Sequence, residues 1–314
     1  MKKLAIVSPC YNEEEVLHKS FVKIENLLQE LIQKGKIASD SFWLLVNDGS
    51  KDSTWKIIED LHYHSAYIKG LNLSHNVGHQ NAIMAGMMTA KECADIVITI
   101  DADLQDDLKC IEQMLDLHNE GNEIVYGVKV SRSSDPFLKK LSAEAFYKLQ
   151  EKMGVRCIFN HADFRLMSKK ALVILSQYPE RNLYLRALIP MIGLKYSTVD
   201  DTIYEREAGK SKYSLSKMLN LALDGITSFS IKPIYLIIYI GIILIITGIF
   251  AISLDVCISI AKGTNVSGWA SLILSMWTVG GLLMTSIGCI GLYIGKIYQE
   301  VKRRPLYNID EFLD

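Results

Sequence analysis

Two uncharged stretches near the C-terminus constrain the fold of this 314-residue chain more than any other feature. Ile234–Leu254 and Trp269–Gly295 contain no Asp, Glu, Lys or Arg. At 1.5 Å of rise per residue, even the shorter stretch forms a helix of about 31 Å, which crosses the hydrocarbon core of a bilayer. The sequence therefore predicts two transmembrane helices, in preference to two buried helices of a soluble core.

Basic residues predict how these helices are oriented. Basic residues precede the first stretch and follow the second. They are Lys212, Lys217, Lys232, Lys296, Lys302, Arg303 and Arg304. The segment between the stretches has Lys262 as its only basic residue. Because positive charge collects on the cytoplasmic side, we expect an integral membrane protein with a short external loop and with both termini in the cytoplasm.

Composition excludes several other classes of protein. The formal net charge of -1 gives no basic field of the kind that nucleic acid binding needs, so no nucleic acid partner is expected. The six cysteines include no CxxC pair, which argues against a zinc knuckle or a redox motif and suits a reducing cytosol. The apolar run near the N-terminus, Leu4–Val7, is too short for a signal peptide.

The first 130 residues alternate short apolar runs with helical patterns. Strands are predicted at Lys3–Ser8, Phe42–Asn47, Tyr67–Leu73, Asp95–Ile100 and Glu123–Tyr126. Helices are predicted between them, at about 13–34, from about 53, at 78–92 and at 107–120. Strand–helix alternation with continuous apolar strands is typical of an α/β protein, with a mostly parallel sheet covered by helices on both faces.

Polar clusters follow four of these strands, at 11–13, 48–50, 75–76 and 101–103. In open parallel sheets, ligands bind beyond the carboxyl ends of the strands. The sequence therefore predicts an active site along this edge.

Asp101 and Asp103 come directly after an apolar strand and are candidate metal ligands. Two carboxylates two residues apart can hold Mg²⁺ or Mn²⁺ against a diphosphate, because these ions prefer oxygen ligands and share them with substrate phosphate. An acidic pair that only solvates a turn is the alternative. Gln105 is a candidate contact to a sugar.

Tyr11, Glu13 and Asp48 are candidate ligands of a nucleoside. The ring of Tyr11 could pack on a base, and the carboxylates of Glu13 and Asp48 could accept hydrogen bonds from a base or ribose. Each also has a structural interpretation, as a helix N-terminus or as an Asp–Gly turn.

Six segments together resemble family 2 glycosyltransferases, which have the Rossmann-like GT-A fold. They are PCYNEEE (9–15), NDGSKDST (47–54), SHNVGHQNAIMAG (74–86), DADLQDD (101–107), ADFRLMS (162–168) and EREAGKSKYS (205–214). Within this family, the chain resembles bactoprenol glucosyltransferases and, more distantly, dolichol-phosphate mannose synthases.

The resemblance implies a role for individual residues. The donor would be bound by Pro9, Tyr11, Glu13, Asp48, Asp101, Gln105, Arg206, Ser211 and Lys212. Asp101 and Asp103 would hold the metal, and Arg132 would hold the acceptor phosphate. Asp163 would lie at the reacting centre beside Asp103, either orienting the acceptor or stabilising charge at the anomeric carbon. A purely structural ion pair of Asp163 with Arg165 or Arg206 is the alternative.

The implied reaction is inverting transfer of a hexose, preferably glucose, from a UDP-sugar to undecaprenyl or another polyprenyl phosphate. Galactose, N-acetylglucosamine and GDP-mannose stay open as donors, as does a non-catalytic membrane partner that only binds nucleotide sugar. A processive polysaccharide synthase would carry a QxxRW segment, and a dinucleotide-dependent dehydrogenase a GxGxxG motif after the first strand. Neither sequence occurs here.

Four regions are expected. A catalytic domain covers 1–210, an amphipathic interfacial helix 211–230, the two spans 231–295 and a cytoplasmic tail 296–314. Glycines in the second span indicate close helix packing, either within the chain or in a homo-oligomer.

Overall fold

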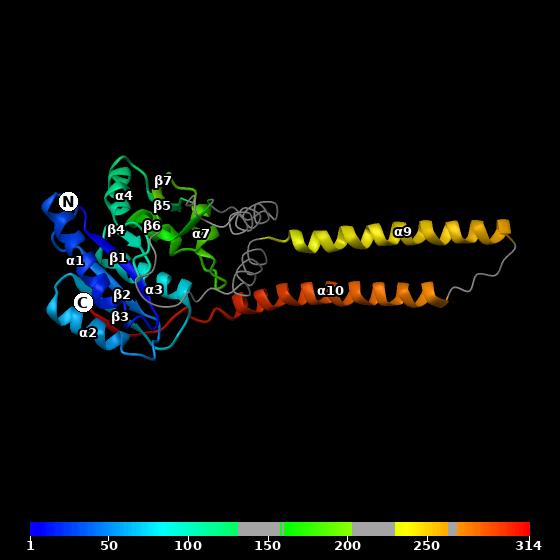
Figure 1. Cartoon of the computed structure of the whole chain (residues 1–314), viewed down its shortest axis with the longest axis horizontal. Helices are drawn as coiled ribbons and strands as arrows, with labels where there is room; N and C mark the ends of the chain where they lie inside the picture. The colour runs from blue at the N-terminus through cyan, green and yellow to red at the C-terminus, as the bar shows by residue number, and fades with distance from the viewer. Residues whose placement is uncertain (131–157, 159, 203–229, 263–268) are drawn as a thin grey trace.

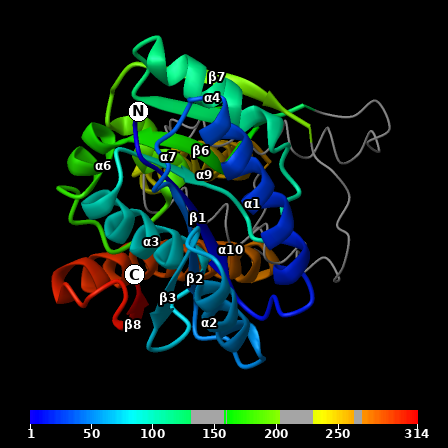
Figure 2. The ribbon, with the colours of Figure 1, turned by 90° about the vertical axis from the view of Figure 1, so that its left-hand side faces the viewer.

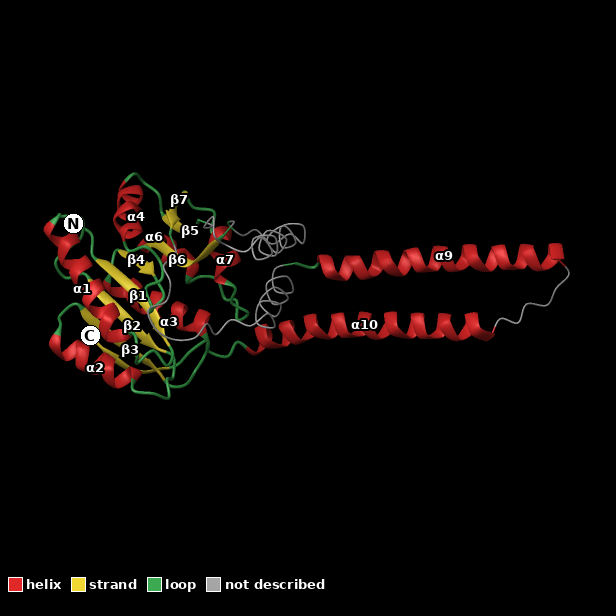
Figure 3. Cartoon of the chain, viewed as in Figure 1, coloured by secondary structure: helices red, strands yellow, loops and turns green. Residues whose placement is uncertain are grey.

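The computed structural model describes residues 1–130, 158, 160–202, 230–262 and 269–314. Among these residues, eight strands form one sheet in the order β7-β5-β6-β4-β1-β2-β3-β8 (Figure 1). Two long helices extend away from this sheet (Figure 3). Residues 211–229 of the predicted interfacial helix lie outside the described residues.

Four parallel strands form the centre of the sheet. They are β1 (Leu4–Cys10), β2 (Phe42–Asn47), β3 (Ile68–Leu73) and β4 (Ile96–Thr99). All six residues of β2 are buried, as expected for a strand with helices on both faces. The predicted strands at this centre are confirmed, to within two residues at either end.

Alternation along these strands divides the core into two layers. Leu4 and Ile6 of β1 pack with α1 (Leu17–Gln33), α2 (Thr54–His64) and α4 (Lys109–Asn119). Ala5 and Val7 face the other way, toward α3 (His79–Cys93), α6 (Lys169–Leu175) and α7 (Leu185–Met191). Figure 2 shows α1 and α3 on opposite sides of β1. Successive side chains of a strand point to opposite faces, so each strand supplies both layers.

Three further strands extend the sheet beyond β4. They are β5 (Ile124–Lys129), β6 (His161–Ser168) and β7 (Tyr196–Asp201). β6 lies antiparallel between β4 and β5, so the sheet is mixed, with four of its seven neighbouring pairs parallel. β6 was not predicted, because its partner strands are distant in sequence and no local pattern of residues identifies them.

The C-terminal part begins with α9 (Lys232–Lys262) and α10 (Trp269–Lys302). By length and composition alone, Ser275–Lys302 of α10 is the one segment in the described part of the chain that could cross a membrane. Lys232–Gly248 of α9 is apolar but shorter. The span predicted at Ile234–Leu254 therefore stays a prediction.

After α10 the chain returns to the sheet. β8 (Ile309–Leu313) pairs antiparallel with β3, with Gly70 opposite Leu313. A segment that the sequence suggested was a tail thus forms one edge of the catalytic sheet.

Candidate active site

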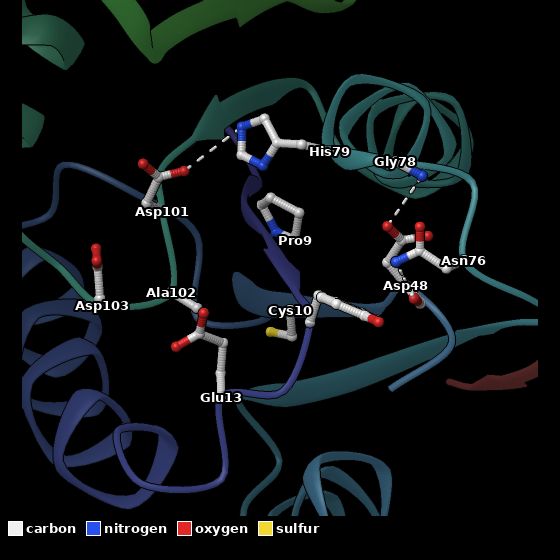
Figure 4. A pocket seen from close by; sticks show the side chains of 11 residues that line it. Pro9, Cys10, Glu13, Asp48, Asn76, Gly78, His79, Asp101, Ala102 and Asp103 are labelled. Atoms are coloured by element: carbon white, nitrogen blue, oxygen red, sulfur yellow. Dashed lines mark hydrogen bonds and ion pairs between the residues drawn. The ribbon is translucent and has the colours of Figure 1, made fainter. Parts of the chain in front are cut away.

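A cavity of about 340 Å³ opens at the carboxyl ends of β1, β2 and β4 (Figure 4). It is lined by Pro9, Cys10, Tyr11, Glu13, Asp48, Asn76, Gly78, His79, Asp101, Ala102 and Asp103. Parallel strands deliver their C-terminal loops to one edge of the sheet, so segments far apart in sequence meet here.

The loops after β1 and β2 are joined by side-chain to backbone hydrogen bonds. The Asn12 side-chain oxygen accepts from the Lys51 N–H at 2.9 Å, and the Glu13 N–H donates to Thr54 Oγ1 at 2.9 Å. Asn12 itself has a left-handed backbone with φ of 55°, a conformation that Asn tolerates better than most residues. This network holds Glu13 at the cavity wall. Helix α1 begins after it, at Leu17, whereas the sequence predicted a start near residue 13.

Asp48 connects the end of β2 to the start of α3. Its Oδ1 accepts from the Val77 N–H at 2.7 Å and its Oδ2 from the Gly78 N–H at 3.1 Å. Burial raises the pKa of this carboxyl, and these two N–H groups oppose the rise. The neighbouring Gly49 has φ of 61°, and a Cβ there would lie 2.4 Å from the Asn76 nitrogen, so only glycine fits.

Asp101 and Asp103 lie in the loop after β4, which Ser20 anchors by donating from Oγ to the Ala102 carbonyl at 2.7 Å. Leu104 follows with a left-handed φ of 48°, which turns the chain immediately after the second carboxylate. Among the described residues, no cluster of three or more His, Cys, Asp or Glu side chains could hold a metal by itself. Asp101 and Asp103 offer carboxylate oxygens, the ligand type that Mg²⁺ and Mn²⁺ prefer, and such ions usually keep substrate phosphate and water among their ligands.

Strand pairing brings Asp163 to the same place. Thr99 of β4 lies opposite Arg165 of β6, and the antiparallel register then carries Asp163 toward Asp101. Asp163 Oδ1 accepts from Arg165 Nη2 at 2.8 Å, and Oδ2 accepts from Arg186 Nη2 at 3.2 Å. Burial would raise the pKa of this carboxyl, but Arg186, His79 and Arg165 together hold it well below its usual range. Asp163 is therefore an anion with little affinity for a proton.

His79 links the two acidic groups. Its Nε2 lies 3.3 Å from Asp163 Oδ2 and 3.7 Å from Asp101 Oδ1. Burial alone would lower the pKa of the ring, yet the two carboxylates raise it above 6.5. The ring therefore bridges the loop after β4 and strand β6.

Comparison with known proteins identifies the family. Residues 5–174 match the sequence model described as glycosyl transferase family 2. The chain belongs to this family.

Relatives of this glycosyltransferase match it over nearly its whole length. Glycosyltransferase YkoT of Bacillus subtilis is 48% identical, over 98% of this chain and 91% of its own. The SfII prophage-derived bactoprenol glucosyl transferase of Shigella flexneri is 36% identical, over 98% and 97%. Among solved structures, mannosyltransferase PcManGT from Pyrobaculum calidifontis, in complex with GDP-Man and Mn²⁺, has a TM-score of 0.48 and 15% identity, over 95% of this chain and 85% of its own.

The glycosyltransferase fold brings most of the described candidate residues together. Six of them line the cavity, namely Pro9, Tyr11, Glu13, Asp48, Asp101 and Asp103. Asp163 reaches the site through His79. Gln105 is half-buried and lies outside the lining of this cavity. Arg132, Arg206, Ser211 and Lys212 lie outside the described residues, so their roles stay predictions.

Two partners of Asp163 were not among the predicted site residues. They are His79, at the start of α3, and Arg186 of α7. The structural alternative for Asp163 is partly correct, because its pair with Arg165 exists. No local signal marks Arg186, since it lies 23 residues from Asp163 and meets it only through the packing of α7 on the sheet.

Proposed function

We propose that this glycosyltransferase transfers a hexose, preferably glucose, from a UDP-sugar to undecaprenyl or another polyprenyl phosphate at the cytoplasmic face of a membrane. The observation that carries the proposal is that Asp101 and Asp103 line one cavity, which Asp163 reaches through His79. The same chain has a helix long and apolar enough to cross a membrane. The bactoprenol glucosyl transferase relative supports the choice of lipid and sugar.

The acidic wall of the cavity suits a nucleotide diphosphate only together with a cation. Asp101 and Asp103 would hold Mg²⁺ or Mn²⁺, which when bound neutralises the diphosphate leaving group. Glu13 and Asp48 lie on the same wall, at the ends of β1 and β2, where a nucleoside could be held. Asp48 retains acceptor capacity beyond its two backbone bonds, because a carboxylate has about four lone-pair positions.

Transfer is a single displacement. An oxygen of the acceptor phosphate forms a bond to the anomeric carbon, the bond from that carbon to the diphosphate oxygen breaks, and the nucleoside diphosphate leaves with the electron pair. The stereochemistry inverts, so an α-linked donor gives a β-linked lipid. The nucleophile is already anionic and needs positioning rather than deprotonation. The low pKa of Asp163 fits this, and we assign it to orienting the acceptor and stabilising positive charge at the anomeric carbon.

The remaining parts of the proposal extend beyond the described residues. Arg206, Ser211 and Lys212 would close over the donor phosphates, and Arg132 would meet the acceptor phosphate. Two spans, with the catalytic domain and both termini in the cytoplasm, would keep the site at the membrane surface.

Transfer from radiolabelled donors to polyprenyl phosphate tests the proposal. Membranes containing the full chain are supplied with UDP-glucose, UDP-galactose, UDP-N-acetylglucosamine or GDP-mannose, with Mg²⁺, Mn²⁺ or a chelator. We expect one metal-dependent lipid product that mild acid hydrolyses, with UDP-glucose the best donor. Nucleotide binding without transfer from any donor would instead indicate a non-catalytic partner.

Asp103→Ala should reduce metal-dependent transfer by about 10²-fold or more, because an electrostatic contact to the leaving group is lost. Turnover is measured across a Mn²⁺ titration, and the far-UV spectrum is compared with that of the parent chain. Asp60→Ala, on the exposed surface of α2, removes a carboxylate away from the cavity and should leave turnover unchanged. Near-normal turnover of the Asp103→Ala variant would contradict the metal assignment.

A further inference from the structure

A second cavity, of about 330 Å³, adjoins the first. It is lined by Val77, Gly78, His79, Gln80, Asn81, Arg181, Asn182, Leu183, Tyr184 and Lys296. Gly78 and His79 line both cavities, so the first turn of α3 separates them. We call this space the Arg181–Lys296 cavity.

The two cavities differ in charge. Four carboxylates line the first, from Glu13, Asp48, Asp101 and Asp103. The residues lining the Arg181–Lys296 cavity include Arg181, Lys296 and His79 but no Asp or Glu. The first cavity accepts a diphosphate only with a cation, whereas the second suits an anion directly, through charge-assisted hydrogen bonds.

The backbone around the cavity adds to its preference for an anion. Gly78 is the N-cap of the 15-residue helix α3, and the first turn of this helix lines the cavity. The helix dipole favours negative charge near this end and so adds to the two side-chain cations. The N–H groups of Val77 and Gly78 themselves donate to Asp48.

The membrane helix forms one side of the cavity. Lys296 is the first charged residue after the uncharged stretch of α10, and Glu300 lies one turn further on. The Glu300 carboxylate accepts from the N–H of Arg181 at 2.9 Å, the N–H of Asn182 at 2.8 Å and Asn182 Nδ2 at 2.8 Å. These bonds fasten the 181–182 loop to the end of α10 and give the Glu300 carboxylate three N–H partners.

We propose that the Arg181–Lys296 cavity binds the phosphate monoester end of the lipid acceptor, with its hydrocarbon chain running along α10 into the bilayer. This inference rests on the proposed function and assigns the acceptor site within it. A phosphate held here lies beside His79, which also lines the donor cavity and contacts Asp163 at 3.3 Å. The acceptor phosphate and the donor would therefore share one boundary, at the first turn of α3.

Substitution of each cation tests this assignment. Arg181→Ala and Lys296→Ala should each raise the KM for polyprenyl phosphate by about 10- to 100-fold, the value of a charge-assisted hydrogen bond. The Kd for UDP should stay within about twofold of the parent value, and Arg181→Lys should recover part of the loss. Arg304→Ala is the matched control, since it removes an exposed charge just beyond α10 that lies outside the cavity.

The lipid composition of the vesicles tests whether the cavity binds the acceptor phosphate or the phosphate of any anionic lipid. Assays use vesicles of phosphatidylcholine with and without phosphatidylglycerol. An acceptor KM unchanged in both alanine variants would overturn the inference, as would a rise that Arg304→Ala reproduces or that occurs only with phosphatidylglycerol. A parallel rise in the Kd for UDP would assign the cavity to the donor.

Direct binding of farnesyl phosphate by equilibrium dialysis separates this inference from the proposed function. If the parent chain catalyses no transfer but binds farnesyl phosphate, and both alanine variants bind it at least tenfold more weakly, the phosphate site stands and the proposed reaction fails. Equal binding by the parent chain and the variants overturns the site, whether or not transfer occurs.

Discussion

At the residue scale, Asp163 shows how its neighbours determine the chemistry of a carboxyl group. It is buried, with Arg165, Arg186 and His79 within 3.3 Å of its oxygens. Their charges hold its pKa below the ordinary value near 3.9, so its ion pairs stabilise the fold above that pH. This contribution is lost as the pH falls through the depressed pKa of the folded state.

Asp163→Asn should abolish transfer and lower the free energy of unfolding by about 3–5 kcal/mol, because Arg165 is then buried beside a neutral amide. Thermal unfolding and turnover of the full chain in detergent measure the two effects. The double variant Asp163→Asn/Arg165→Met should recover part of the stability but none of the activity. Recovery of activity together with stability would show that Asp163 is only structural.

At the scale of elements, α10 is both a candidate membrane span and part of the wall of the site. Its helix continues seven residues beyond Gly295, the last residue of the uncharged stretch, to Lys302. Those last two turns carry Lys296 and Glu300, which meet the loop before α7. Lys296, which the sequence indicated only as a topology signal, therefore lies with Glu300 where α10 joins the catalytic domain.

Glu300→Ala should release the 181–182 loop from α10. Three N–H groups lose an acceptor, so we expect hydrogen–deuterium exchange at the amides of Arg181 and Asn182 to rise by about tenfold. Mass spectrometry of the peptide that contains them measures this. Gln299→Ala, an exposed neighbour on the same helix, should leave exchange unchanged. Equal exchange rates in both variants would show that Glu300 does not hold the 181–182 loop.

At the scale of the whole molecule, the chain leaves the sheet for the long helices α9 and α10 and then returns to it. β8 pairs with β3 along the outer edge, and Asp314 forms an ion pair with Lys69. The side chain of Leu313 also packs close to Gly70. Because an unpaired edge strand is open to association with another chain, β8 protects β3 as well as completing the sheet.

Deletion of residues 309–314 should lower the free energy of unfolding of the catalytic domain by about 1–3 kcal/mol and increase its aggregation. Thermal unfolding and light scattering of the full chain in detergent measure both effects. Deleting Asp314 alone removes an exposed ion pair but keeps the strand, and should have a small effect. Equal stability of the two deletions would contradict a structural role for β8.

The sequence by itself determined the centre of the sheet and the acidic cavity. Phe42–Asn47 is the strand predicted, residue for residue, because a strand buried on both faces is a continuous apolar run. Asp48, Asp101 and Asp103 were predicted to converge because parallel strands deliver their ends to one edge, which local sequence can show.

Tertiary structure alone decided the rest. No local pattern indicates that β6 inserts antiparallel beside β4, that Arg186 reaches Asp163, or that 309–313 returns to β3. Asp163 and Arg186 are 23 positions apart in the sequence. Lys69 and Asp314, which pair where the chain returns to β3, are 245 positions apart. Their geometry follows from how whole elements pack. Arg165 comes from the motif that contains Asp163, but the fold brings His79 and Arg186 to that carboxylate.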